Sequence, residues 1–98
     1  MEIHPLQRKT DLLSAIGETL RALRNERALT LRQVAEGAHV SISYLAEIER
    51  GEKDPSSRVL ESIAQGLGVA MGDLLLRIAV TLEPEALAAT PVAETLAA

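Results

Sequence analysis

The stretch VSISYLAEIERG, residues 40–51, concentrates side chains that can exchange hydrogen bonds with a partner. Ser43, Tyr44, Glu47 and Arg50 share one side of a predicted helix, because steps of three and four residues keep neighbours on one face. A hydroxyl donates and accepts, a carboxylate accepts, and a guanidinium only donates. We therefore expect a polar, exposed helix face, which carries the only aromatic residue of the chain.

The sequence lacks a set of side chains that could carry out catalysis beside this polar helix face. The chain has two histidines, His4 and His39, no cysteine and no Gly-rich phosphate-binding loop. These residues form no set of nucleophile, base and orienting group, and without cysteine there is no Cys-based metal site. We expect no enzymatic activity, no cofactor and no metal.

Length and composition limit the kind of fold that can position this polar helix face. A chain of 98 residues makes one domain with room for a tail. Its apolar fraction of 47% comes mainly from Leu, Ala, Ile and Val, which suits small helices in close contact. The first residues lack the apolar run of a signal peptide, and no segment reaches the roughly 18 consecutive apolar residues of a membrane span. We expect a soluble, cytoplasmic protein.

The charges are divided unevenly along the chain. Residues 1–58 contain nine Lys or Arg and nine Asp or Glu, a net charge of zero, whereas residues 59–98 contain one Arg and five acids, a net charge of −4. The total of −4 would disfavour a nucleic-acid partner, but nearly all cations lie in the first part. A basic face can form there, although the count does not require one.

Apolar residues at steps of three and four predict five short helices. The first should run from about residue 12 to 27, with Asp11 as its N-cap. Thr30 and Gln33 form a capping box that starts the second at about residue 31. The apolar stripes of these two helices are Leu13, Ile16, Leu20 and Leu23, then Leu31, Val34, Ala35 and Ala38.

The other three helices follow the turn AHVS, residues 38–41. Ser41 caps the third helix, and Gly51 stops it. Pro55 suits the first position of a fourth helix over about 56–66, which Gly66 and Gly68 end. A fifth helix should start at about residue 71, although LRIAVTL, residues 76–82, could also form a β-strand. The apolar faces are Ile42, Leu45 and Ile48; Val59, Leu60, Ile63, Ala64 and Leu67; and Leu74, Leu75 and Ile78.

Two short helices joined by a tight turn make a helix-turn-helix. Residues 14–76 resemble the Cro/C1-type (XRE) helix-turn-helix family, through IGETLRALRNERALTLRQVAEGAHVSISYLAEIERG, PSSRVLESIAQGLGV and GDLL. The resemblance implies an all-α, five-helix, lambda-repressor-like DNA-binding domain with a C-terminal extension. Within the family, VSISYLAEIERGEKDPSSRVLESI is most similar to regulators of Clp protease genes of actinobacteria. We divide the chain into an N-terminal arm (1–10), the domain (11–78) and a flexible or dimer-supporting extension (79–98).

The resemblance also implies how the domain would meet DNA, with the third helix in the major groove and the second across the backbone. By position, Ile42, Ser43 and Glu47 face the bases, where a serine can bond to either kind of base edge and a glutamate can accept from the cytosine N4 amine. Ser41 and Tyr44 fall near phosphates. Further phosphate contacts are expected from Arg32, Arg50, Lys53, Ser56 and Ser57.

Several of these residues could have a structural role instead of a DNA-binding one. Tyr44 could belong to the core, although its place opposite the apolar side of the helix argues against that. Glu47 could be a solvated charge or pair with Arg50, and its carboxylate repels phosphates unless it meets a base donor. Arg32 and Lys53 could be ordinary surface charges.

The resemblance further implies that Arg24 pairs with Glu49 and so orients the third helix. Three positions depart from the family pattern. His39 replaces the usual Gly at a turn position with positive φ, which His tolerates better than most residues, so a structural role is favoured over a ligand role. Leu31 replaces a Gln that touches phosphate in many relatives, and Ala70 is a poor cap for the fifth helix.

Family members usually bind as two-fold dimers on half-sites about one DNA turn apart, so we expect a homodimer on a (pseudo)palindromic operator. The residues expected at the dimer contact are Leu74, Leu76, Ile78, Val80 and Leu82, which could instead only close the core. No ligand-binding segment follows, so small-molecule control within this chain is not expected. The end, Leu96-Ala97-Ala98, resembles the end of the bacterial tag for Clp-type proteolysis, or is an Ala-rich end without that meaning.

These patterns favour a sequence-specific, double-stranded-DNA-binding transcription regulator, with protease or stress genes among its possible targets. The alternative is an antitoxin or another protein-interaction module with the same fold. A polar third helix favours DNA, whereas Ile42 is the residue there that favours a protein partner.

Overall fold

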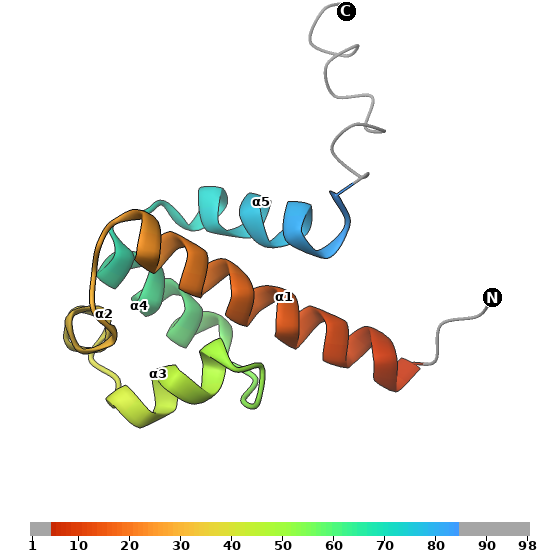
Figure 1. Ribbon diagram of the computed structural model, residues 1–98, viewed down its shortest axis with the longest axis horizontal. Helices are drawn as coiled ribbons and strands as arrows, with labels where there is room; N and C mark the ends of the chain where they lie inside the picture. The colour runs from red at the N-terminus through yellow and green to blue at the C-terminus, as the bar shows by residue number, and fades with distance from the viewer. Residues whose placement is uncertain (1–4, 85–98) are drawn as a thin grey trace, which may run out of the picture.

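The computed structural model describes residues 5–84, and the side chains of residues 12–84 (Figure 1). The described helices are α1 (Pro5–Glu26), α2 (Leu31–Ala38), α3 (Ile42–Glu49), α4 (Ser57–Leu67) and α5 (Met71–Leu82). The long helix α1 lies between α5 on one side and α3 on the other (Figure 1). It packs against both, while α2 packs against α3 and α4. The predicted all-α, five-helix, lambda-repressor-like fold class is confirmed.

The starts of α2 and α3 follow the predicted capping pattern. The Thr30 hydroxyl accepts a hydrogen bond from the Gln33 N–H at 3.0 Å, and the Gln33 side-chain oxygen accepts from the Thr30 N–H at 2.8 Å. The Ser41 hydroxyl accepts from the Tyr44 N–H at 3.0 Å. These bonds satisfy N–H groups that a helix start leaves without an intrahelical partner, so both boundaries are fixed by local chemistry.

The start of α1 differs from the prediction. The helix begins at Pro5 rather than near residue 12, so Asp11 lies inside it instead of capping it, and residues 5–10 of the predicted N-terminal arm are helical. Pro is well suited to a first helical position because its φ is already helical and its missing N–H would have no partner there. Residues 6–11 contain no Gly or Pro to interrupt the helix.

The boundaries of α4 also differ. Pro55 lies two residues before the helix and is buried, and the cap is Ser56, whose hydroxyl accepts from the Val59 N–H at 3.1 Å. Gly66 lies inside the helix. The left-handed residue that ends it is Gly68, with φ 76° and ψ 30°, as expected of a C-terminal glycine.

The segment 76–82 is helical, so its alternative as a β-strand was wrong. Ala70 precedes α5 without a side-chain capping bond, as the sequence suggested. Of the apolar face predicted for this helix, Leu74 and Ile78 are buried but Leu75 is 50% exposed. Leu74 and Ile78 are therefore part of the core of their own chain and were wrongly included in the predicted dimer contact.

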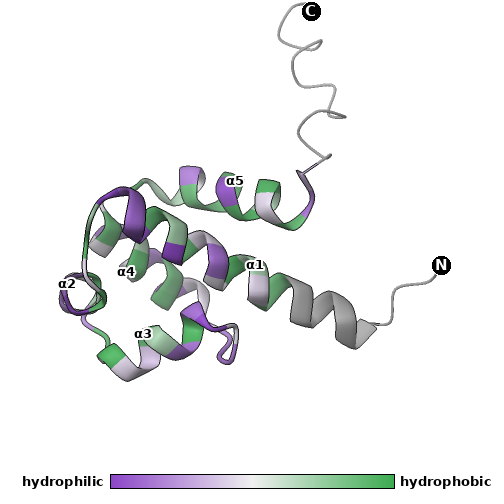
Figure 2. Cartoon of the chain, in the orientation of Figure 1, coloured by the Kyte–Doolittle hydropathy of each residue, from purple (hydrophilic) through white to green (hydrophobic). Residues whose placement is uncertain are grey.

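One core joins the described helices, and Figure 2 shows hydrophobic and hydrophilic segments alternating along them, as amphipathic helices require. Its members are Ile16, Leu20, Leu23, Val34, Ala35, Ala38, Leu45, Ile48, Leu60, Ile63, Ala64, Leu67, Leu74 and Ile78. Within residues 5–84, no single helix is long and apolar enough to span a membrane. Together α4 and α5 have that length and hydropathy, but they are bent by 103° and each contributes buried side chains to the core.

Two glycines let helices approach closely. A Cβ added to Gly66 would lie 2.8 Å from the Val34 carbonyl oxygen and 3.1 Å from the Ala38 nitrogen, both backbone atoms of α2. A Cβ on Gly17 of α1 would lie 2.6 Å from the Ile48 carbonyl oxygen at the end of α3. Since backbone atoms cannot move aside as a side chain can, these glycines set the distances that position α2 and α3.

Candidate nucleic-acid interface

The turn between α2 and α3 is closed by backbone hydrogen bonds. His39 has φ 58° and ψ 40°, the left-handed conformation that the sequence predicted for it, and its N–H donates to the Glu36 carbonyl at 3.2 Å. The Val40 N–H donates to the Ala35 carbonyl at 3.0 Å. The two helices therefore form a helix-turn-helix, and α3 lies on the surface of the molecule away from α5 (Figure 1).

The outward side of α3 carries polar groups. Ser43 is exposed and Glu47 is partly exposed, whereas Leu45 and Ile48 on the inward side are fully buried. Ser41 is exposed at the helix start. Ile42 is partly buried and packs against the core, so only part of its side chain faces outward.

Tyr44 does not lie opposite the apolar side as predicted. It is partly buried and packs against the core. At about 100° per residue, a step of four places Tyr44 only about 40° from Ile48 around the helix, so the ring borders the buried side. The side chain therefore sits at the edge of the α3 surface, and its hydroxyl is the part that can bond to a polar partner.

A bidentate ion pair holds the end of α3 against α1. Arg24 Nε donates to Glu49 Oε2 at 2.8 Å and Nη2 donates to Glu49 Oε1 at 3.0 Å, as the family resemblance implied. A third bond runs from Arg24 Nη1 to the Leu29 carbonyl at 3.2 Å. The side chains are 15% and 8% exposed. The hydrogen bonds that Arg24 donates to Glu49 raise the pKa of Arg24 above its ordinary value, against a smaller opposing effect of burial.

The candidate phosphate-binding residues are exposed on the segments that flank α3 in the chain. Arg32 is exposed in the first turn of α2, Lys53 is exposed in the loop after α3, and Ser56 and Ser57 are exposed at the start of α4. The Ser56 oxygen is already engaged as the helix cap, so its hydroxyl proton and the nearby backbone N–H groups are what it can offer an anion. The predicted residues of α2, of the loop after α3 and of the start of α4 are therefore each accessible to a partner.

Arg50 has a partner that the sequence reading missed. Its Nε and Nη2 donate to Glu52 Oε2 and Oε1, each at 3.0 Å, so its partner is Glu52 and not Glu47. The turn that brings them together passes through Gly51, which has φ 76°. Side chains two residues apart do not face each other on a helix. The only sequence signal for the Arg50–Glu52 contact is therefore Gly51, where the chain can turn back.

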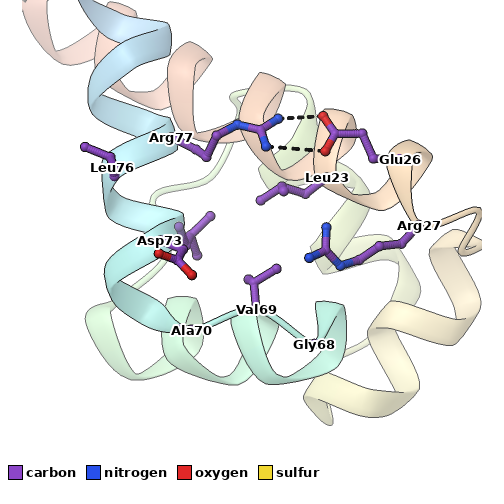
Figure 3. Close-up of a pocket in the computed structure, with 10 residues that line it drawn as sticks. Leu23, Glu26, Arg27, Gly68, Val69, Ala70, Asp73, Leu76 and Arg77 are labelled. Atoms are coloured by element: carbon purple, nitrogen blue, oxygen red, sulfur yellow. Dashed lines mark hydrogen bonds and ion pairs between the residues drawn. The ribbon is translucent and has the colours of Figure 1, made fainter. Parts of the chain in front are cut away.

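Away from α3, a groove of about 420 Å³ lies between the end of α1, the loop 68–70 and α5 (Figure 3). Arg77 spans it and donates to Glu26 at 2.6 Å and 3.3 Å. Leu76, at one side of the groove, is 56% exposed. Along α5 the exposed side chains include Leu75, Leu76 and Leu82, so this helix is apolar on its outer side as well as toward the core.

With this geometry in place, the protein can be assigned to a family. Residues 15–78 match the sequence model of a family described as a helix-turn-helix domain. The match spans more than half of the chain, and the protein belongs to this helix-turn-helix family, of the Cro/C1 (XRE) type that its motifs resemble.

Its relatives are transcription regulators. The HTH-type transcriptional regulator DdrOP3 of Deinococcus deserti is 45% identical over 58 residues, which cover 59% of this chain and 45% of that protein. The transcriptional regulator ClgR of Mycobacterium tuberculosis is 43% identical over 61 residues, covering 62% and 54%. The crystal structure of the clp gene regulator ClgR from Corynebacterium glutamicum aligns with a TM-score of 0.70 at 38% identity, over 88% of this chain and 86% of that one. The chain spans about half the length of the curated relatives it matches.

Proposed function

We propose that this protein is a sequence-specific, DNA-binding transcription regulator that acts in the cytoplasm and inserts α3 into the major groove. The observation that carries the proposal is the arrangement of α3: its inward side is fully buried, its end is fixed by the Arg24–Glu49 pair, and its outer side is polar. A helix held this rigidly can present side chains to base edges in a fixed register. Family membership supports the same function.

Base reading is assigned to the outer side of α3. Ser43 donates or accepts at either kind of base edge, Glu47 accepts from a cytosine N4 amine, and the exposed part of Ile42 makes apolar contact with a thymine methyl group. Glu47 must find such a donor, because a carboxylate beside phosphates is otherwise repelled. We therefore expect a preferred C·G pair opposite Glu47 in each half-site.

Backbone contacts are assigned to the residues around α3. They are Arg32, Ser41, Tyr44, Arg50, Lys53, Ser56 and Ser57. Contacts to phosphate fix the register of the protein on the duplex and carry the salt-sensitive part of the affinity, because each neutralised phosphate releases counterions.

The test is binding of the purified protein to fragments of its own genome at about 50 and 200 mM salt, with the bound fragments sequenced. We expect enrichment of a (pseudo)palindromic motif that weakens at the higher salt. Absence of enrichment at both concentrations would reject the proposal and favour the alternative, an antitoxin or another protein-interaction module with the same fold. Because the similar ClgR protein is described as a clp gene regulator, protease genes are the first targets to inspect.

We propose a homodimer as the DNA-binding form. The outer side of α5 supports it, since Leu75, Leu76 and Leu82 are exposed on a helix whose other side is already buried. An apolar outer face of this kind is typical of a subunit contact. A second copy presenting the same face would cover these leucines through a two-fold contact. Of the predicted contact residues, Leu76, Val80 and Leu82 stay in the proposal, and Leu75 joins them.

Most of the predicted extension 79–98 lies outside the described residues, and so does the predicted recognition of Leu96-Ala97-Ala98 by a Clp-type protease. We propose it on the sequence resemblance alone. Appending a charged pair after Ala98 should lengthen the half-life of the protein in cells, and an unchanged half-life would reject it.

A further inference from the structure

The Arg50–Glu52 pair stands at the point where α3 leaves the proposed DNA surface. Both side chains are more than half exposed, at 56% and 55%, yet two hydrogen bonds of 3.0 Å join them in a bidentate pair. Hydrogen bonds from Arg50 hold the pKa of Glu52 below its ordinary value, so the carboxylate is charged at neutral pH. An exposed pair of this kind contributes little to the stability of the fold. A role in DNA binding would account for its position beside α3.

A carboxylate and a phosphate offer a guanidinium the same thing, two oxygens in a plane that accept a fork of N–H groups. Glu52 therefore occupies on Arg50 the place that a DNA phosphate would take. To bind a phosphate, Arg50 must exchange Glu52 for it, and the released carboxylate then lies close to the negatively charged backbone. The loss of the Glu52 bonds and the repulsion between the released carboxylate and the phosphates both reduce the contribution of Arg50 to DNA affinity.

We propose that Glu52 is a phosphate mimic that restrains Arg50, so that the sequence-independent affinity of the protein for DNA is kept low. The inference rests on the proposed DNA-binding function. Sequence-independent contacts let a regulator bind anywhere on a genome, and specificity is the ratio of operator binding to such binding. A restrained cation beside α3 lowers binding to unrelated DNA, while operator binding keeps the affinity that its base contacts add.

A matched control exists on the other side of the molecule. Glu26 and Arg77 form a bidentate pair of similar exposure, 51% and 42%, between α1 and α5. In Figure 1, α5 and α3 lie on opposite sides of α1. Glu26→Gln and Glu52→Gln change the net charge equally, and each leaves one arginine without its carboxylate partner. Glu26→Gln frees Arg77 on α5, whereas Glu52→Gln frees Arg50 beside α3.

The experiment measures the Kd of wild type, Glu52→Gln, Glu26→Gln and Arg50→Gln/Glu52→Gln between 50 and 200 mM salt. The probes are a duplex carrying the site that the wild type enriches and a duplex of the same length with an unrelated sequence. For Glu52→Gln we expect at least about threefold tighter binding to the unrelated duplex at 50 mM salt, with a slope of log Kd against log salt steeper by about 0.9. Glu26→Gln should keep the wild-type slope, and the double variant should show none of the gain, because it lacks the arginine that Glu52→Gln frees.

Three outcomes would overturn the inference alone, provided that the wild type enriches a site. Glu52→Gln could bind the unrelated duplex as tightly as the wild type does, it could match Glu26→Gln, or it could bind more weakly. The last result would make Glu52 a residue that positions Arg50 for DNA. If the wild type enriches no site, the proposed function itself fails, and this inference fails with it.

Discussion

At the residue scale, the Arg24–Glu49 pair holds the end of α3 against α1. The substitution Glu49→Gln removes a charge from a site that is 8% exposed and leaves the guanidinium of Arg24, 15% exposed, without its counter-ion. We expect the free energy of unfolding to fall by about 3 kcal/mol, the lower end for breaking a buried pair, because some water still reaches Arg24. Urea denaturation measures this.

The matched control for that substitution is Glu52→Gln, which breaks the pair of the exposed Arg50 in the same way. It should leave the midpoint of unfolding unchanged within error. Equal effects of the two substitutions would mean that burial does not make Arg24–Glu49 important, and the account of how α3 is fixed would be wrong.

Tyr44 combines a ring packed against the core with a position at the edge of the α3 surface. Tyr44→Phe keeps the ring and removes the hydroxyl, so stability should stay the same while operator affinity falls about threefold, roughly the value of one hydrogen bond. Tyr44→Ala should lower both. If Tyr44→Phe binds DNA as the wild type does, the hydroxyl makes no contact and Tyr44 is a packing residue only.

At the element scale, α2 is held by its close approach to α4. Gly66→Ala should destabilise the protein by about 2 kcal/mol, because the new Cβ would lie 2.8 Å from a backbone oxygen of α2 and the helices must move apart. Gly72→Ala, in α5, is the control: a Cβ there meets nothing within 4 Å, so we expect a gain of about 0.5 kcal/mol from helix propensity. Thermal unfolding of both variants decides it, and a Gly66→Ala protein as stable as the wild type would contradict the close approach.

The elements that sequence reasoning predicted well are those fixed by neighbouring residues. Thr30, Gln33 and Ser41 cap helices through contacts three residues apart, and His39 takes the left-handed conformation that ends α2. The missed boundaries depend on distant contacts. Gly66 resembles a helix stop in sequence, yet it is required inside α4 by the backbone of α2.

Some features of the candidate site were also predicted from the sequence. The family resemblance identified α3, its polar residues and the Arg24–Glu49 pair. The prediction placed Tyr44 with Ser43 on the polar face. It missed that Tyr44 borders the core, because it did not take into account that Tyr44 lies only about 40° from Ile48 around the helix. Nor did it indicate Glu52, because the bond to Arg50 depends on the reversal of the chain at Gly51.

At the scale of the whole molecule, the exposed leucines of α5 predict a two-fold dimer. Leu76→Glu places a charge in the proposed contact, so the particle mass should fall from twice 10.5 kDa to 10.5 kDa and operator affinity should fall at least about tenfold, as one half-site is lost. Gln65→Glu adds the same charge on an exposed position of α4 and should change neither. Sedimentation equilibrium measures the mass, and a wild-type protein that is already monomeric on its operator would contradict this.

The central claim is that the outer side of α3 reads a two-fold DNA sequence, and selection from a random duplex library tests it most directly. The wild type and Glu47→Gln should be compared, with Glu61→Gln on an exposed position of α4 as the control of equal charge. The account predicts two inverted half-sites with centres about one helical turn apart, and a changed preference at the same position of both halves for Glu47→Gln alone. An identical motif from all three proteins, or no motif from the wild type, would contradict it.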